Sequence, residues 1–439
     1  MNLLLTTLAE MPVPRDLPLP LPLPATLLKV LLVLFFLVHI LFVNLTVGAS
    51  LLVTIFEFMG RKPGRERYDD LALAFAKTVT VNKSLAVVMG IGPLLCINLV
   101  YTLQWYGANA LTGHAWLLII PLVTTAFLLT YLHKYQWESW RHGRRKILHL
   151  ATGAAATLLF LCIPFIFLAN ANLMLFPGEW EKVIGFFSAL QVGNVLPRYL
   201  HFLLASVALS SLFGAWWFWR EDAPVPGFTR EQLRRTFYGV AAAATACQFL
   251  AGPLLLLTLP GIGITGRLYA IIIPSAALGL LTLLLLLKKW HGPDSELGRE
   301  HGLIWILFSV VVLGMGSGRH AYREAALATQ TAAIAERSAA YEKALADFNE
   351  SHHEQAIPTE SPEQLFATCG ACHAPDHRLV GPPLQEIARI YANNPAGIVA
   401  WAKAPGKKRP DYPQMPPFAH LGDDKLRLIA DYLLATAPK

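Results

Sequence analysis

Long apolar runs dominate the chain, and short connections between them hold most of its charged residues. A helix needs about 20 apolar residues to cross the hydrocarbon core of a bilayer. Eight runs approach or exceed this length, at about 25–56, 71–100, 115–133, 147–170, 196–219, 236–258, 268–287 and 302–318. The pattern therefore predicts about eight membrane-spanning helices. The first run is long enough to tilt or to continue beyond the membrane.

The segments that flank the apolar runs have other patterns. Residues 1–24 end in a proline-rich stretch that favours polyproline II, and we expect the first run to be a retained anchor rather than a signal peptide. Residues 319–360 predict a helical stalk, because they are rich in Ala and Glu, followed by a polar linker. The sequence thus predicts an all-α protein, with a polytopic membrane helical bundle over 25–318 and a small all-α domain over 361–439.

Charged residues make up only 15% of the chain, whereas soluble proteins contain about 25%. This composition excludes a single soluble enzyme and a disordered chain, and we expect no nucleic-acid partner. Sixteen basic residues lie in the loops after the first, third, fifth and seventh runs, and four lie in the remaining connections and the N-terminal segment. The positive-inside rule then predicts a protein of the cytoplasmic membrane whose termini and C-terminal domain face the periplasm.

The C-terminal domain opens on the run CGACH, formed by Cys369 to His373. Two thiols at this spacing can form thioethers with both vinyl groups of one haem, and the adjacent histidine can bind the iron. We therefore predict one covalent haem c on Cys369, Cys372 and His373. A zinc or dithiol site is the alternative, but the chain has no second pair of cysteines at this spacing.

The iron of a haem c needs a second axial ligand, and a methionine thioether is a common choice. Met415 is the only methionine of this domain, and His377 and His420 are the alternatives. With Met415 as ligand, the domain resembles a class I cytochrome c over nearly all of residues 361–438.

Two histidines of the apolar runs lie away from the predicted cytoplasmic ends, His39 in the first run and His201 near the outer end of the fifth. Ionisable side chains are rare inside membrane spans and usually have a function there. Each is either a ligand of a b-type haem or a hydrogen-bonded histidine of the core. His133, His149 and His301 lie at the cytoplasmic ends of spans, where we expect them to be solvated or to contact lipid headgroups. Lys77 and Lys83 lie in the first half of the second run; we expect them to extend to the cytoplasmic face, and the alternative is that they line a polar path.

The sequences around both histidines resemble helices of subunit I of cytochrome bd quinol oxidases. HILFVNLTVG, which begins at His39, is similar to the first helix, whose histidine is an axial ligand in the high-spin haem pair. VLPRYLHFLLASVALSSLFGAWWF, which contains His201, resembles the fifth helix, whose histidine binds the low-spin haem b. The similarity covers about 25–260 and, more weakly, 268–320. It implies one or more b haems, with His39 and His201 as ligands.

The chain departs from that family at several functional positions. Only LPGIGITGR replaces the quinol loop between the sixth and seventh helices, and the third span lacks the glutamates that carry protons. The methionine and glutamate that serve as further haem ligands are also missing from the seventh and eighth helices. Candidates for the open axial positions are Met315, His320, Met174 and His114.

These features predict a membrane-bound electron-transfer cytochrome that passes electrons between a periplasmic haem c and haem b in the bundle. We expect it to be a subunit of a respiratory complex, with other membrane or periplasmic subunits, a soluble cytochrome or a quinone as partner. The alternative is a terminal oxygen or nitric oxide reductase of the cytochrome bd superfamily, supplied by its own cytochrome c domain.

Overall fold

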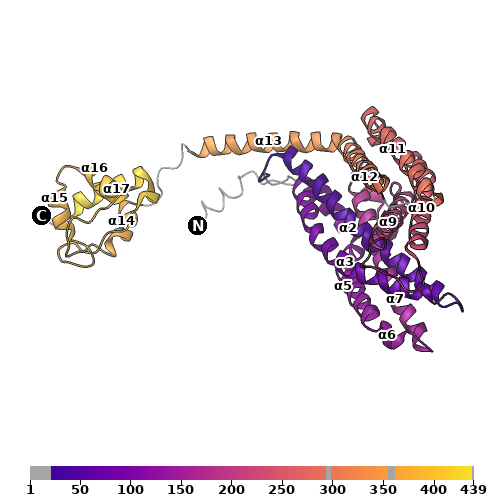
Figure 1. Cartoon of the computed structure of the whole chain (residues 1–439). Coiled ribbons are helices and arrows are strands. Elements are labelled where there is room, and N and C mark those ends of the chain that lie inside the picture. Colours follow the sequence, from indigo (N-terminus) through magenta and orange to yellow (C-terminus); the bar gives the residue numbers. More distant parts are fainter. Residues whose placement is uncertain (1–20, 293–297, 354–360, 438–439) are drawn as a thin grey trace. The chain divides into compact units, whose positions relative to one another are not determined.

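The computed structural model describes residues 21–292, 298–353 and 361–437. Of residues 79–82, 298 and 351–353 it describes the backbone alone. The first 20 residues of the proline-rich N-terminal segment and most of the predicted linker lie outside the described residues. The chain divides between Ser338 and Ala339 into two compact units, a helical bundle and a C-terminal unit (Figure 1).

Eight helices of the described bundle are long and apolar enough to cross a membrane, which confirms the eight predicted spans. Each observed helix contains its predicted run or ends within two residues of it. The helices are α2 (Ala25–Gly60), α3 (Arg67–Val100), α5 (His114–Tyr135), α7 (Arg145–Leu173), α9 (Val195–Trp217), α10 (Arg230–Leu257), α11 (Gly266–His291) and α12 (Gly298–Ala326).

Several connections contain short helices that the hydropathy pattern does not predict. They are α4 (Thr102–Thr112), α6 (Trp137–Trp140), η1 (Pro177–Lys182), α8 (Phe186–Ala189) and η2 (Gly261–Gly263). In α4, one face is buried because Trp105 packs edge-on against Trp116, with ring centroids 5.3 Å apart. Tertiary packing, rather than length, stabilises such short helices.

Helix α2 is central to the bundle, because it packs against α3, α7 and α9. It approaches α9 closely at Gly48, where a Cβ atom would lie 2.1 Å from the carbonyl oxygen of Ser206. Only glycine permits this contact between two helix backbones. We call the end of the bundle that carries the connections 61–66, 136–144 and 218–229 the basic end; it is the predicted cytoplasmic end.

The C-terminal unit is built from short helices around a small apolar core. The helices are α14 (Pro362–Gly370), α15 (Leu384–Ile390), α16 (Pro395–Lys403), η3 (Ala419–Leu421) and α17 (Gly422–Thr436). Leu365 of α14 and Leu426, Ile429 and Leu433 of α17 are buried. Helix α13 (Ala328–His353) lies where the stalk is predicted. No strand occurs among the described residues, so the predicted all-α fold is confirmed.

The expectation for the polar residues at the basic end is largely wrong. His133, His149 and His301 are buried at 4%, 0% and 6% exposure rather than solvated. His301 bonds to the hydroxyl of Tyr238, 2.6 Å away. Lys83 is also buried, with its ammonium 3.5 Å from the ring centroid of Tyr131, whereas Lys77 is exposed as expected. Partners on neighbouring helices, which hydropathy does not reveal, keep these groups inside.

Candidate haem sites

In the C-terminal unit, the chain after His373 folds back so that Gly381 and Pro382 lie beside the CGACH motif. The amide of Gly381 donates to the carbonyl of Cys372 over 2.9 Å. His373 Nδ1 donates to the carbonyl of Pro382 over 2.8 Å, which leaves the lone pair on Nε2. A Cβ at Gly381 would lie 2.4 Å from His373 Cε1, so glycine makes room for the ring. The imidazole is therefore fixed with Nε2 available to an iron.

The three candidates for the second axial ligand of haem c differ in exposure. Met415 is partly buried, whereas His377 and His420 are exposed. His377 Nδ1 is paired with the carboxylate of Asp376 at 2.9 Å, and His420 lies beside Phe418. Met415 thus has the setting that best suits a ligand held within the fold. Burial raises the pKa of the Cys369 thiol, as expected for a cysteine inside the unit.

His39 projects from α2 toward α3. Its Nδ1 donates to the carbonyl of Ala86 over 2.8 Å, and this bond again leaves the lone pair on Nε2. A Cβ at Gly90 would lie 3.0 Å from His39 Cε1, so this glycine provides space beside the ring. A hydrogen bond from one ring nitrogen to a carbonyl is the usual support of an imidazole that binds metal through the other nitrogen.

His201 projects from α9 toward α10, where Gly252 lies beside its ring. Its Nδ1 is buried and has no hydrogen-bond partner among the described residues. An unpaired polar atom inside a protein costs about 1–3 kcal/mol. No described group therefore competes with a ligand for this nitrogen, and the residue fits a haem site.

Three arginines form a cationic cluster at the end opposite to the basic end. Arg198 lies one turn before His201 in α9, and Arg319 and Arg323 lie in α12. Each has a buried guanidinium nitrogen without a hydrogen-bond partner, and no described carboxylate pairs with any of them. Arg319 is close enough to the other two for their charges to repel. Buried cations need an anion, and the propionate carboxylates of a haem would supply one.

The candidates for the open axial positions are dispersed. Both ring nitrogens of His320 are engaged, one with Arg323 at 3.1 Å and the other with Glu324 at 3.5 Å. Met315 is partly buried in α12, Met174 is 1% exposed within a hydrophobic cluster, and His114 is exposed at the start of α5. Because both ring nitrogens of His320 already bond to protein groups, Met315 suits an open axial position better than His320 does.

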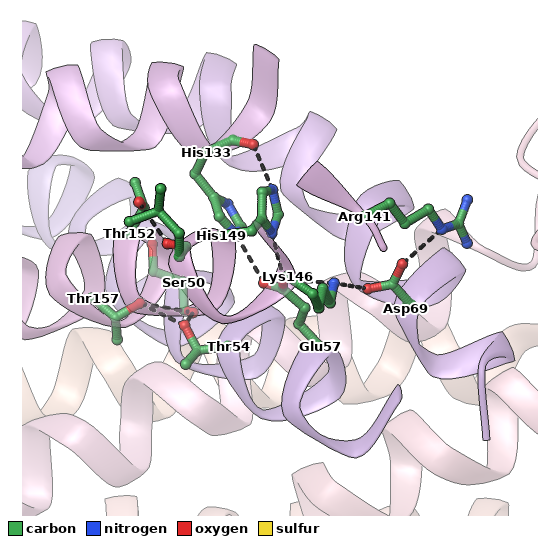
Figure 2. Close-up of polar contacts among 11 residues, drawn as sticks. Ser50, Thr54, Glu57, Asp69, His133, Arg141, Lys146, His149, Thr152 and Thr157 are labelled. Carbon is green, nitrogen blue, oxygen red and sulfur yellow. Dashed lines mark hydrogen bonds and ion pairs between the residues drawn. The ribbon is translucent and has the colours of Figure 1, made fainter. Parts of the chain in front are cut away.

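A buried polar cluster at the basic end was not predicted as a unit. Glu57 of α2 bonds to His133 Nε2 at 2.8 Å, to His149 Nδ1 at 2.5 Å and to the ammonium of Lys146 at 2.7 Å. Figure 2 shows both imidazoles reaching the carboxylate, with Lys146 continuing to Asp69. The signal in the sequence is weak, because it consists only of polar residues that share one end of three spans.

Asp69 continues the cluster outward to Arg141, whose Nε lies 2.8 Å from the carboxylate. Arg141 also bonds to Asp70. Partial burial opposes the charge on Arg141, but the hydrogen bond and the charge of Asp70 outweigh it and raise the pKa of the arginine. Arg141 therefore keeps its positive charge at the outer edge of the cluster.

Comparison with known proteins places the chain in a family. The chain matches the family described as cytochrome bd terminal oxidase subunit I over residues 27–256, and the cytochrome c family over residues 361–437. It is similar to a structure of the bd oxidase from Geobacillus thermodenitrificans, with a TM-score of 0.56 and 12% identity over 75% of this chain and 98% of that chain. This likeness concerns the fold alone.

No curated protein matches the chain. The first family match covers more than half of the sequence, and the second covers the C-terminal unit. Both families and the eight apolar helices describe a multi-pass membrane protein of haem-based electron transfer. The chain belongs to the cytochrome bd terminal oxidase subunit I family and carries a C-terminal cytochrome c domain.

Proposed function

We propose that the protein is a membrane-bound electron-transfer cytochrome that passes electrons between a haem c in its C-terminal unit and haem b in its helical bundle. The observation that carries this proposal is shared by His39 and His373. Each donates from Nδ1 to a backbone carbonyl at 2.8 Å and lies against a glycine, so its Nε2 is available to an iron. A bound haem supplies a one-electron couple of its iron.

The C-terminal unit would hold one haem c through Cys369 and Cys372, with His373 and Met415 as axial ligands. The chain's contribution is to fix the His373 ring through Pro382 and to keep a soft sulfur ligand within the fold. A thioether ligand would favour the reduced state of the iron, so we expect a high potential for this haem.

The bundle would hold two b haems, one at His39 and one at His201. The two rings face different partners, since His39 lies against α3 and His201 against α10. Arg198 and Arg319 would neutralise propionates at the end opposite to the basic end. Met315 and His320 remain our candidates for further axial ligands, with Met315 preferred because His320 is engaged elsewhere.

The basic loops support an inner-membrane protein with both termini and the haem c on the periplasmic side. A membrane redox complex is the expected setting, with further subunits as partners. A cavity of about 820 Å³ lies at the end opposite to the basic end and is lined by Phe176, Gln191, Ile262 and Gln330 among others. Its size and mixed lining suit a small amphipathic molecule such as a quinone.

The second candidate function is a terminal reductase that uses electrons from its own haem c. The buried cluster around Glu57 favours it, because such a reaction consumes protons and the third span lacks the family's glutamates. Carbon monoxide separates the two functions. A strong shift of the reduced b-haem spectrum would indicate an open iron position and a reductase, whereas an unchanged spectrum would indicate an electron relay.

The test of the proposed function is a count of haems in the purified full-length protein, by pyridine haemochrome spectra combined with redox titration. We expect one c haem and two b haems per chain. One c haem without any b haem would overturn the assignment of His39 and His201.

A further inference from the structure

The cluster around Glu57 is one of the most deeply buried groups of ionisable residues in the described bundle. The side chains of Glu57 and His149 are 1% and 0% exposed, and that of His133 is 5% exposed. They come from α2, α7 and α5, and Figure 2 shows the two imidazoles beside the carboxylate. Burying such groups is costly unless their hydrogen bonds are satisfied, so their arrangement is informative.

If both imidazoles were neutral and Glu57 were ionised, one of the two hydrogen bonds of His149 would lack a hydrogen. The cluster therefore holds one additional proton. His149 Nε2 lies 2.9 Å from the carbonyl of His133, which only accepts, so Nε2 carries a hydrogen. His149 Nδ1 lies 2.5 Å from Glu57 Oε1. A neutral ring would turn a lone pair toward the carboxylate there, so one further proton must lie between Nδ1 and Oε1.

The charged neighbours of this proton come from every element around it. Lys146 and Arg141 supply positive charge, Asp69 and Asp70 supply negative charge, and the His133 ring stacks on that of His149 at 4.1 Å between centroids. Stacked imidazoles repel when both are charged, which favours a single extra proton for the pair. Lys146 and Asp69 link this proton outward to Arg141, whose side chain is 23% exposed.

These residues also have the donor types of a metal site, because their ligand atoms lie within 4.8 Å of one another. Two features argue against a metal. The ammonium of Lys146 already bonds to Glu57 Oε1 at 2.7 Å, which adds positive charge at the carboxylate. The imidazole planes are also only 27° apart, so that their nitrogens approach the carboxylate from a stack rather than from separate directions.

Hydroxyl groups continue the cluster into the bundle. A cavity of about 20 Å³ lies beside His133 and is lined by Ser50, Thr54, Thr130 and Thr157 among others. A water molecule needs about 10–15 Å³, so this space suits one water. Thr54 and Thr157 pair at 2.8 Å, and both bond to the carbonyl of Ser50.

We infer that the Glu57–His149 pair is a proton-loading site at the cytoplasmic end of a polar row that leads along α2 toward the haem site at His39. A proton from water at the basic end binds between Oε1 and Nδ1, and it moves on through His133 and the cavity to the hydroxyls. Only N–H and O–H bonds form and break, and no electron moves at this site. The inference rests on the second candidate function, a terminal reductase that consumes protons at a haem b held by His39.

The test is the rate of proton uptake when the haems of the full-length protein are photoreduced in weakly buffered detergent solution with a pH-indicator dye. Glu57→Gln keeps the shape of the side chain but removes its charge, and we expect at least a tenfold slower uptake. Thr54→Val is isosteric and interrupts the hydroxyl pair, and we expect a severalfold slowing. Glu138→Gln, a change at an exposed glutamate of the same end, should leave the rate unchanged.

Three results would overturn the inference: no proton uptake by the wild type, wild-type rates in Glu57→Gln with intact haem spectra, or a stoichiometric metal that is lost in Glu57→Gln. The last result would assign a metal site instead. Absence of haem b from the wild type would refute the proposed function and, with it, the destination of the row. Haem b with unchanged uptake in Glu57→Gln would refute the proton-loading site alone.

Discussion

Ser206 Oγ donates a 3.0 Å hydrogen bond to Asn44 Oδ1, and each partner lies five residues beyond a histidine that we assign to haem. Helices α2 and α9 run parallel, since both end at the basic end, before the connections 61–66 and 218–229. Ser210, one turn after Ser206, bonds to the Asn44 and Leu45 carbonyls beside this contact. His39 and His201 therefore lie at the same depth, about 7.5 Å along their helices from the bond and rotated by about 140° from it. The geometry indicates two separate sites.

The separation of the sites can be tested by removing one histidine at a time. His39→Ala and His201→Ala should each lower the ratio of haem b to haem c from about two to about one, because each variant removes one axial ligand and leaves the other site intact. Haemochrome spectra measure the ratio. His142→Ala, at an exposed histidine of the basic end, should leave it unchanged. Loss of all haem b in either variant would indicate a shared site.

Gly381 provides a test of the haem c site. In Gly381→Ala the new methyl group would lie 2.4 Å from His373 Cε1, and the ring cannot move away without breaking its bond to Pro382. Overpacking of this kind costs about 1–3 kcal/mol. We expect a lower thermal midpoint of the haem c absorbance and an altered spectrum. Gly370→Ala is the control, since its nearest neighbour is 3.6 Å away, and equal midpoints for both variants would contradict this account.

The sequence predicts the large features of this protein because they depend on local patterns. Hydropathy defines the eight spans, and CGACH defines the haem c motif within five residues. The cluster at the basic end could not be predicted in the same way. Glu57 is separated from His133 by 76 positions and from His149 by 92, and only the packing of three helices brings them together.

The same reason explains the errors and omissions of the sequence interpretation. Lys83 was expected to extend to the cytoplasmic face, because the long stem of a lysine usually lets its ammonium reach the surface. In the structure, the ring of Tyr131 from α5 covers its ammonium. The short helix α4 was missed because Trp105 is buried by residues from other elements rather than by a long apolar run. Contacts between distant segments decided each case.

The arginine cluster predicts a shift of potential. A positive charge near a haem favours the reduced form, so Arg198→Gln should lower the midpoint potential of the haem b at His201 by about 50 mV, equivalent to about 1 kcal/mol. Arg319→Gln should act in the same direction. The measurement is a redox titration of the b-haem absorbance. Arg267→Gln is the control, because its side chain is 68% exposed; an equal shift there would show that the effect is not local.

The ligand role of Met415 can be tested through the midpoint potential of haem c. A thioether stabilises the reduced iron relative to a nitrogen ligand, so Met415→His should lower the midpoint potential of haem c by about 0.1 V or more, within the range of about 0.8 V that axial ligands control. The covalent attachment should persist, since Cys369 and Cys372 are unchanged. Redox titration at the haem c band measures the shift. His377→Asn and His420→Asn are matched controls at exposed histidines and should leave the potential at its wild-type value. If His420→Asn shifts the potential and Met415→His does not, the ligand is His420, and the partly buried position of Met415 reflects packing alone.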